Sequence, residues 1–151
     1  MPQATVSTFY LHAKLHRPAL PEDYVPRLRL LAQLDKTLHY RLATITAPAG
    51  YGKSTLASAW IEQVGCPAVW LSLDQGDDDL VAFVGYMVFA IRSVVPDFGE
   101  RVLTLAQASS RPPLVTIITY LLHALDQLER DIVLVLDDFH LITSGEVHEL
   151  L

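Results

Sequence analysis

Residues 47–54 read APAGYGKS and combine small residues, a lysine and a serine in a pattern that can bind phosphate groups. Gly50 and Gly52 allow the main chain to curl so that its amides point at phosphate oxygens. Lys53 would reach the terminal phosphates, and the hydroxyl of Ser54 would bind Mg²⁺. The segment therefore predicts a phosphate-binding loop.

Ala47 stands at the first position of the pattern G-x-x-x-x-G-K-[ST], where glycine is usual. Its β-carbon disfavours a positive φ, so we expect this residue in the β or α region. The alternative is a strand, a turn and a helix that carry a lysine by chance. Because a strand is expected before the segment and a helix after it, phosphate binding is favoured. The other residues expected to line the nucleotide are Pro48, Ala49, Tyr51 and Thr55.

A second candidate segment, IVLVLDD at 132–138, is an apolar run that ends in two carboxylates. Such a run is typical of a strand buried on both faces of a sheet, and ligands of open α/β sheets bind at the carboxyl ends of the strands. Asp137 would hold Mg²⁺ through water, and Asp138 would orient or polarise an attacking water. The alternative is a strand that ends in a solvated turn. The upstream lysine segment favours the first interpretation, with Lys53 and Asp138 as catalytic residues.

The elements that must position these segments alternate along the chain. Helical spacing of apolar residues predicts helices over 27–38, 53–64, 77–94 and 114–128. Residues 97–111 are expected to form a helix-and-loop connection, and the predicted strands are 41–47, 68–74 and 131–139. The order predicts an α/β fold with a mostly parallel sheet and helices on both sides.

Composition limits the classes of function open to the chain. It has 151 residues, of which 51% are apolar, and a formal net charge of −6. The acidic balance argues against nucleic-acid binding by this segment, since duplex binding depends on clustered Lys and Arg. No apolar run reaches the length of a spanning helix, and the N-terminus lacks a secretory signal. Together with the single Cys66, which fits a reducing compartment, these features predict a cytoplasmic protein with no membrane partner.

Two groups of polar residues are expected to have structural roles. The aspartates at 77–79 are expected at a solvated helix start, whose positive end suits them, rather than in a metal cluster. His12 and His16 are four positions apart, but the sequence offers no evident third ligand, so we do not expect them to bind metal.

Four blocks of the sequence resemble the MalT-like, LuxR-type transcription regulators, which are signal-transduction ATPases with numerous domains. The blocks are KLHRPALPEDYVPRLRLL, ITAPAGYGKSTLASAWI, AVWLSLDQGDDDLVAFVGYMVFAI and IVLVLDDFHLI. They extend from about Lys14 to Leu151, and the alanine at position 47 matches that family's usual loop. The resemblance implies a P-loop NTPase fold, a three-layer sandwich with a mostly parallel sheet, and ATP or ADP with Mg²⁺ as cofactors.

The resemblance also implies how the chain is divided. Residues 1–40 would form an arm and helix on the adenine side, and residues 41–151 a partial P-loop core. In the YVPR segment, Val25 and Arg27 would contact the base or its surroundings, although Pro26 stands where related ATPases often have glycine. In this class a strand from later in the chain lies between the lysine-loop strand and the Asp-Asp strand. The sheet is therefore expected to be incomplete, and the chain a fragment.

Three hypotheses for the function follow. In the first, the resemblance implies an ATP-binding, slowly hydrolysing switch whose nucleotide state controls self-association and so transcription, with DNA bound only by a C-terminal domain outside this chain. In the second, the chain is a truncated fragment without autonomous activity. In the third it is a small P-loop enzyme such as a kinase, although no chain remains after the Asp pair to hold an acceptor site.

Overall fold

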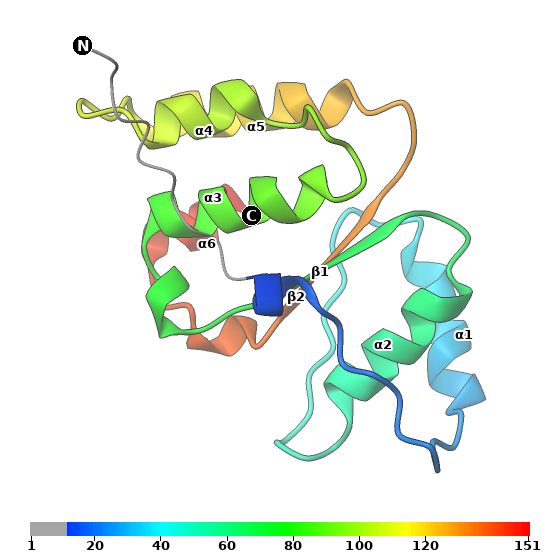
Figure 1. Ribbon diagram of the computed structural model, residues 1–151. Coiled ribbons are helices and arrows are strands. Elements are labelled where there is room, and N and C mark those ends of the chain that lie inside the picture. The colour runs from blue at the N-terminus through cyan, green and yellow to red at the C-terminus, as the bar shows by residue number, and fades with distance from the viewer. Residues whose placement is uncertain (1–11) are drawn as a thin grey trace.

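The computed structural model describes residues 12–151 and shows an α/β fold, as predicted (Figure 1). The helices are α1 (Leu28–Thr37), α2 (Lys53–Gln63), α3 (Leu80–Arg92), α4 (Glu100–Ala106), α5 (Leu114–Asp126) and α6 (Gly145–Leu150). Short 3-10 helices are η1 (His12–Leu15), η2 (Gln75–Asp77) and η3 (Phe139–Leu141). The strands are β1 (Ala68–Ser72) and β2 (Val133–Asp137).

β1 and β2 form a two-stranded parallel sheet. Ala68 pairs with Val133 and Ser72 pairs with Asp137, so both strands end at the same edge of the sheet. The connection between them contains α3, α4 and α5, as a parallel pair requires a long crossover. The sheet crosses the molecule between the α1–α2 pair and the group formed by α3 to α6 (Figure 1).

The prediction of a strand at 41–47 is wrong. These residues lie outside any strand, and within the described part of the chain no backbone hydrogen bond involves residues 41–46. The β-branched residues of this segment favour an extended backbone, but a strand also needs a neighbour that supplies the ladder hydrogen bonds. No described strand runs beside the segment, and the side chains of Tyr40 and Leu42 are 73% and 70% exposed.

β2 is half-buried along its whole length, which corrects the prediction of a strand buried on both faces. The centre of β1, by contrast, is buried from Val69 to Leu71. The difference follows from position in the sheet, because β1 covers one edge of β2 and no described strand covers the other. The apolar run was a correct indicator of a strand but not of its full burial.

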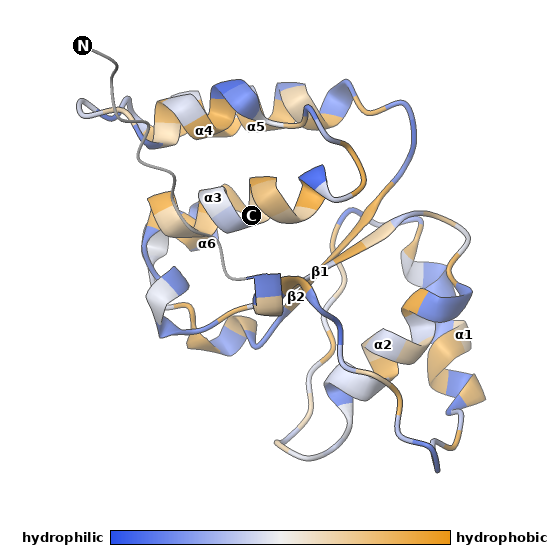
Figure 2. Ribbon diagram, viewed as in Figure 1, coloured by the Kyte–Doolittle hydropathy of each residue, from blue (hydrophilic) through white to orange (hydrophobic). Residues whose placement is uncertain are grey.

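The larger hydrophobic core lies between the sheet and the helices α3 to α6. α3 is apolar on nearly all sides, and its residues Phe83, Val84 and Ile91 are at most 1% exposed (Figure 2). A helix of this composition is stable only when other elements surround it. α5 contributes Ile117 and Leu121 to this core, whereas Leu125 is 37% exposed.

A smaller core joins α1 to α2. Leu31 and Leu34 of α1 pack with Leu56 and Trp60 of α2. The indole Nε1 of Trp60 also donates a hydrogen bond of 2.8 Å to Oδ1 of Asp35. These contacts confirm the predicted helical spacing and hold the helix that begins at Lys53 against α1.

The segment between β1 and α3 is held by side-chain hydrogen bonds, and one of its aspartates is buried rather than solvated. The side chain of Asp77 is 1% exposed, and its Oδ2 accepts hydrogen bonds from Nζ of Lys14 at 2.6 Å and from the amide of Asp74 at 2.8 Å. Asp79 caps α3 by accepting a bond of 3.0 Å from the amide of Ala82. The expectation of solvation is therefore wrong for Asp77, because a lysine from the N-terminal segment provides its counter-charge.

Within residues 12–151, no helix combines the length and the hydropathy that crossing a bilayer requires.

Candidate functional site

Residues 47–54 form a turn that leads directly into the first turn of α2. Gly50 and Gly52 have φ values of 80° and 77°, in the left-handed region that strains residues with a β-carbon. Gly52 is the N-cap of α2, and no side chain of residues 12–151 caps this end of the helix. The first amides of a helix lack intrahelical partners and carry partial positive charge. The backbone of this turn therefore suits an anion.

Lys53 lies over the turn. Its Nζ donates to the carbonyl oxygens of Ala47 at 2.9 Å and of Pro48 at 3.2 Å. Among the described residues Asp138 is the only non-glycine residue with a positive φ, so the expectation for the backbone of Ala47 is confirmed. The ammonium group is thus held by neutral acceptors, which a charged phosphate oxygen could replace with a stronger bond.

Ser54 and Asp137 bring the two predicted segments together. The hydroxyl of Ser54, in the first turn of α2, donates a hydrogen bond of 2.9 Å to Oδ1 of Asp137, the last residue of β2. Both groups present oxygen atoms, the ligands that Mg²⁺ prefers, and Mg²⁺ commonly binds one or two protein groups together with water and phosphate. The pair therefore fits the Mg²⁺ site expected from the sequence.

Asp138 follows β2 with a φ of 57°, a conformation that aspartate tolerates better than most residues. Its amide donates to Oδ1 of Asp137 at 3.1 Å, and its carboxylate lies 3.8 Å from Nδ1 of His140. The Asp138 side chain is 52% exposed. Asp138 thus lies at the same edge of the sheet as the Ser54–Asp137 pair, with its carboxylate open to water.

The two residues expected on the adenine side have different environments. Val25 is 77% exposed. Arg27 instead contacts the turn at residues 47–54, because its Nη1 donates a hydrogen bond of 3.0 Å to the carbonyl of Tyr51. The ring of Tyr51 is itself 62% exposed, so it is the backbone of this residue that belongs to the turn.

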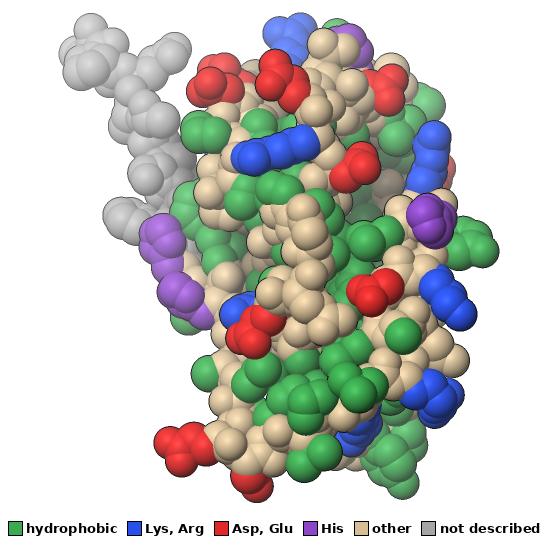
Figure 3. All heavy atoms as spheres, turned by 90° about the vertical axis from the view of Figure 1, so that its right-hand side faces the viewer, with side chains coloured by type: hydrophobic (Ala, Val, Ile, Leu, Met, Phe, Trp, Pro, Cys, Tyr) green, Lys and Arg blue, Asp and Glu red, His purple; other side chains and the backbone are tan. Residues whose placement is uncertain are grey.

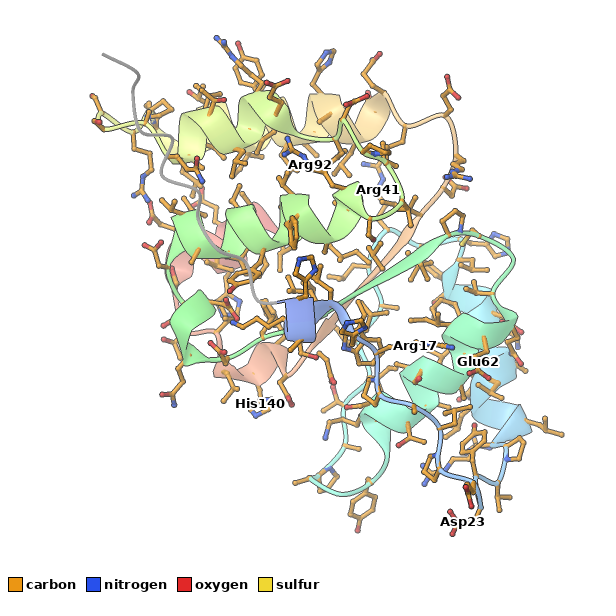
Figure 4. All side chains as sticks on the ribbon, viewed as in Figure 1. Arg17, Asp23, Arg41, Glu62, Arg92 and His140 are labelled. Atoms are coloured by element: carbon orange, nitrogen blue, oxygen red, sulfur yellow. The ribbon has the colours of Figure 1, made fainter. Side chains whose placement is uncertain are left out.

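Residues 17 and 18 are hydrogen-bonded to α2, and the sequence did not predict these contacts. Arg17 donates to the carbonyl of Ser58 at 2.9 Å and to Oε1 of Glu62 at 2.9 Å, and Figure 4 shows Arg17 and Glu62 side by side. The hydroxyl of Ser58 in turn donates to the carbonyl of Pro18 at 2.6 Å. Arg17 and Glu62 are 45 positions apart, so no local sequence pattern could have predicted that they form a pair.

A further connection lies near the carboxyl edge of the sheet. Asp78 accepts hydrogen bonds of 2.6 Å from the hydroxyl and the amide of Thr143 and from the amide of Ser144. The bonds from Thr143, and then that from Ser144, lower the pKa of Asp78 below its ordinary value of 3.8. This carboxylate therefore joins the loop after β1 to the loop that follows η3.

The sequence is similar to that of a known transcription regulator. The HTH-type transcriptional regulator MalT of Cronobacter sakazakii (strain ATCC BAA-894) is 39% identical to this chain over 140 residues. The chain is related to the MalT-like, LuxR-type regulators. The aligned residues are 91% of this chain and 15% of the C. sakazakii regulator, so the chain spans a small part of that protein's length. No protein-family model matches the chain.

Proposed function

We propose that the chain is a nucleotide-binding switch module of a LuxR-type transcription regulator, and that it binds ATP or ADP with Mg²⁺. The hydrogen bond of 2.9 Å between Ser54 and Asp137 is the observation that carries the proposal. A P-loop NTPase fold accounts for it, because that fold brings the lysine loop and the carboxyl end of the Asp-Asp strand to the same edge of a parallel sheet. The relationship to MalT-like regulators supports the same function.

The phosphates would bind at the start of α2. The amides of residues 50–53 and the N-terminal end of the helix attract negative charge. Lys53 would exchange its bonds to the carbonyls of Ala47 and Pro48 for bonds to phosphate oxygens. Each new bond joins two charged groups, and such bonds are roughly twice as strong as neutral ones.

Asp137, the last residue of β2, and Asp138, which follows it, would have different roles. Mg²⁺, when bound, neutralises charge on the phosphates. Ser54 and Asp137 would hold the ion, and their present distance of 2.9 Å leaves them close enough to share it directly or through water. Asp138, whose carboxylate is half exposed, would accept a proton from the attacking water. Slow hydrolysis would then reset the switch.

Regulation would require further chain segments. Residues 41–47 and the outer edge of β2 both lack a neighbouring strand among the described residues. In the P-loop fold a strand occupies the place between them. In Figure 3 hydrophobic side chains gather on the face that carries α1 and α2, which suits contact with additional protein. We propose that nucleotide binding controls such contacts and self-association, and that a separate domain binds DNA.

Hydrogen exchange of the purified chain tests the proposed site. Addition of ATP and Mg²⁺ should slow the exchange of the amides at residues 50–55, because these amides would bind phosphate oxygens. The helix α5 lies in the other group of helices and provides an internal control with unchanged exchange. Exchange at 50–55 that is equally fast with and without the nucleotide would overturn the proposal.

A second candidate function is favoured by the unpaired segment 41–47. In this alternative the chain binds no nucleotide by itself and serves only as a surface for other protein segments. The same exchange experiment separates the two candidates. Slow exchange at residues 133–137 together with an unresponsive turn at 50–55 would support the second candidate, since the chain would then be folded but would not bind ATP.

A further inference from the structure

We infer that Arg27 is a positioning residue on the phosphate side of the site, where it holds the turn at residues 50–52 in the conformation that binds phosphate. The inference rests on the proposed function and deepens it. The family resemblance implies that Arg27 lies at the base of the nucleotide. The geometry points instead to the turn that receives the phosphates.

The guanidinium group of Arg27 lies against two consecutive residues of the turn. Its Nη1 donates to the carbonyl of Tyr51 at 3.0 Å. A β-carbon added to Gly52 would lie 3.4 Å from Nη2 of the same arginine. Arg27 therefore contacts the peptide unit that joins Tyr51 to Gly52, and both Gly52 and the nearby Gly50 have positive φ values.

This contact fixes the direction of one amide in the turn. In a trans peptide the C=O and N–H bonds point to opposite sides of the chain, and the unit is planar. A carbonyl of Tyr51 that is held by Arg27 therefore turns the N–H of Gly52 away from the arginine. Gly52, on one side of this peptide unit, would otherwise let the unit rotate at lower cost than a residue with a β-carbon. The hydrogen bond thus reduces the entropy that the turn would lose on binding phosphate.

Arg27 itself is held by α1. It is the N-cap residue of this helix, and its carbonyl accepts hydrogen bonds from the amides of Leu30 at 2.8 Å and of Leu31 at 3.0 Å. Leu31 in turn packs in the core between α1 and α2. The guanidinium group therefore extends from the start of α1, a helix that packs against α2, rather than from a free loop.

The test compares ATP with inorganic tripolyphosphate, which carries the phosphates without the base. Affinities are measured by displacement of a fluorescent ATP analogue from wild type, Arg27→Ala, Arg27→Lys and Arg29→Ala. Arg29 is a matched control, since it is an exposed arginine of the same helix. Arg27→Ala should weaken ATP and tripolyphosphate alike, by about tenfold, because a hydrogen bond from a charged donor is lost. Arg27→Lys should recover part of the affinity, and Arg29→Ala should bind as wild type does.

Two results would overturn the inference. Tripolyphosphate binding that is unchanged in Arg27→Ala while ATP binding weakens would place the arginine at the base. Unchanged binding of both ligands would mean that the contact with Tyr51 has no role in the site. Failure of the proposed function looks different, because wild type would then bind neither ligand or would bind both no better than Lys53→Ala. Thermal unfolding of each variant checks that the fold is intact.

Discussion

The hydroxyl of Ser54 lies 2.9 Å from Oδ1 of Asp137, although 83 positions separate the two residues in the chain. α2 positions the first residue and β2 the second, and the register of β2 against β1 fixes where the strand ends. The hydrogen bond therefore depends on the folded arrangement of the sheet and the helix. It joins the two segments that carry the candidate chemistry.

Ser54→Ala should weaken ATP binding by about tenfold when Mg²⁺ is present and should have little effect when EDTA removes the ion. The reason is that the hydroxyl would bind the metal and not the nucleotide. Calorimetric titration under both conditions measures the difference. Ser54→Thr, which keeps the hydroxyl, serves as the control. An equal loss of affinity with and without Mg²⁺ would contradict the assigned role.

Asp138→Asn and Asp138→Ala should separate charge from backbone conformation. Asparagine tolerates the φ of 57° found at this position, so Asp138→Asn should abolish ATP hydrolysis with little change in stability. Alanine tolerates that φ less well, so Asp138→Ala should also lower the free energy of unfolding by about 1 kcal/mol. Phosphate release and urea denaturation measure the two effects. Wild-type hydrolysis by Asp138→Asn would exclude this carboxylate as the group that orients water.

Gly52→Ala should disrupt nucleotide binding, because a β-carbon is strained at a φ of 77° and would lie 3.4 Å from Nη2 of Arg27. The expected loss of ATP affinity is about tenfold or more, in line with roughly 1–2 kcal/mol of backbone strain. Gly65→Ala is the control, since no atom of the described residues lies within 4 Å of the added carbon and the φ of Gly65 is not in the left-handed region. ATP titration of both variants decides the matter. Similar affinities for the two would show that the conformation at Gly52 is unimportant.

Acid should weaken the connection made by Asp78. Its folded-state pKa is lowered below 3.8, first by Thr143 and then by Ser144. A lowered pKa gives a stabilisation that is complete above the unfolded value and disappears as pH falls through the folded value. Wild type should therefore be more stable than Asp78→Asn at pH 6, and this difference should shrink below pH 3.8. Urea denaturation at several pH values measures it. A difference that stays constant through this range would rule out the ionised carboxylate as its source.

The sequence predicted those elements whose stability depends on the local spacing of apolar residues. Leu31 and Leu34 repeat at helical spacing and are buried, as are Leu56 and Trp60 in α2. The strand at 41–47 could not be judged in this way, because a strand depends on a neighbour elsewhere in the chain. Local composition favours an extended backbone there, and the structure includes these residues in no strand.

In the candidate site, too, local patterns could be predicted and contacts between distant residues could not. The lysine, serine and aspartate positions follow from short patterns, and the structure places Ser54 beside Asp137. The burial of Asp77 and the contact of Arg27 with Tyr51 could not be predicted, because each depends on a side chain that approaches from a distant position. Lys14 is 63 positions from Asp77, and Arg27 is 24 positions from Tyr51.

The affinity of the Lys53→Ala variant for ATP in the presence of Mg²⁺ tests the central claim most directly, with calorimetric titration beside the wild-type chain. The ammonium group of Lys53 lies within 3.2 Å of two carbonyls of the turn and would bind the terminal phosphates. We predict saturable binding by wild type and a loss of at least tenfold in the variant, as expected for a lost charged hydrogen bond. Equal affinity of the two proteins for ATP would contradict the proposal that residues 47–54 bind the nucleotide.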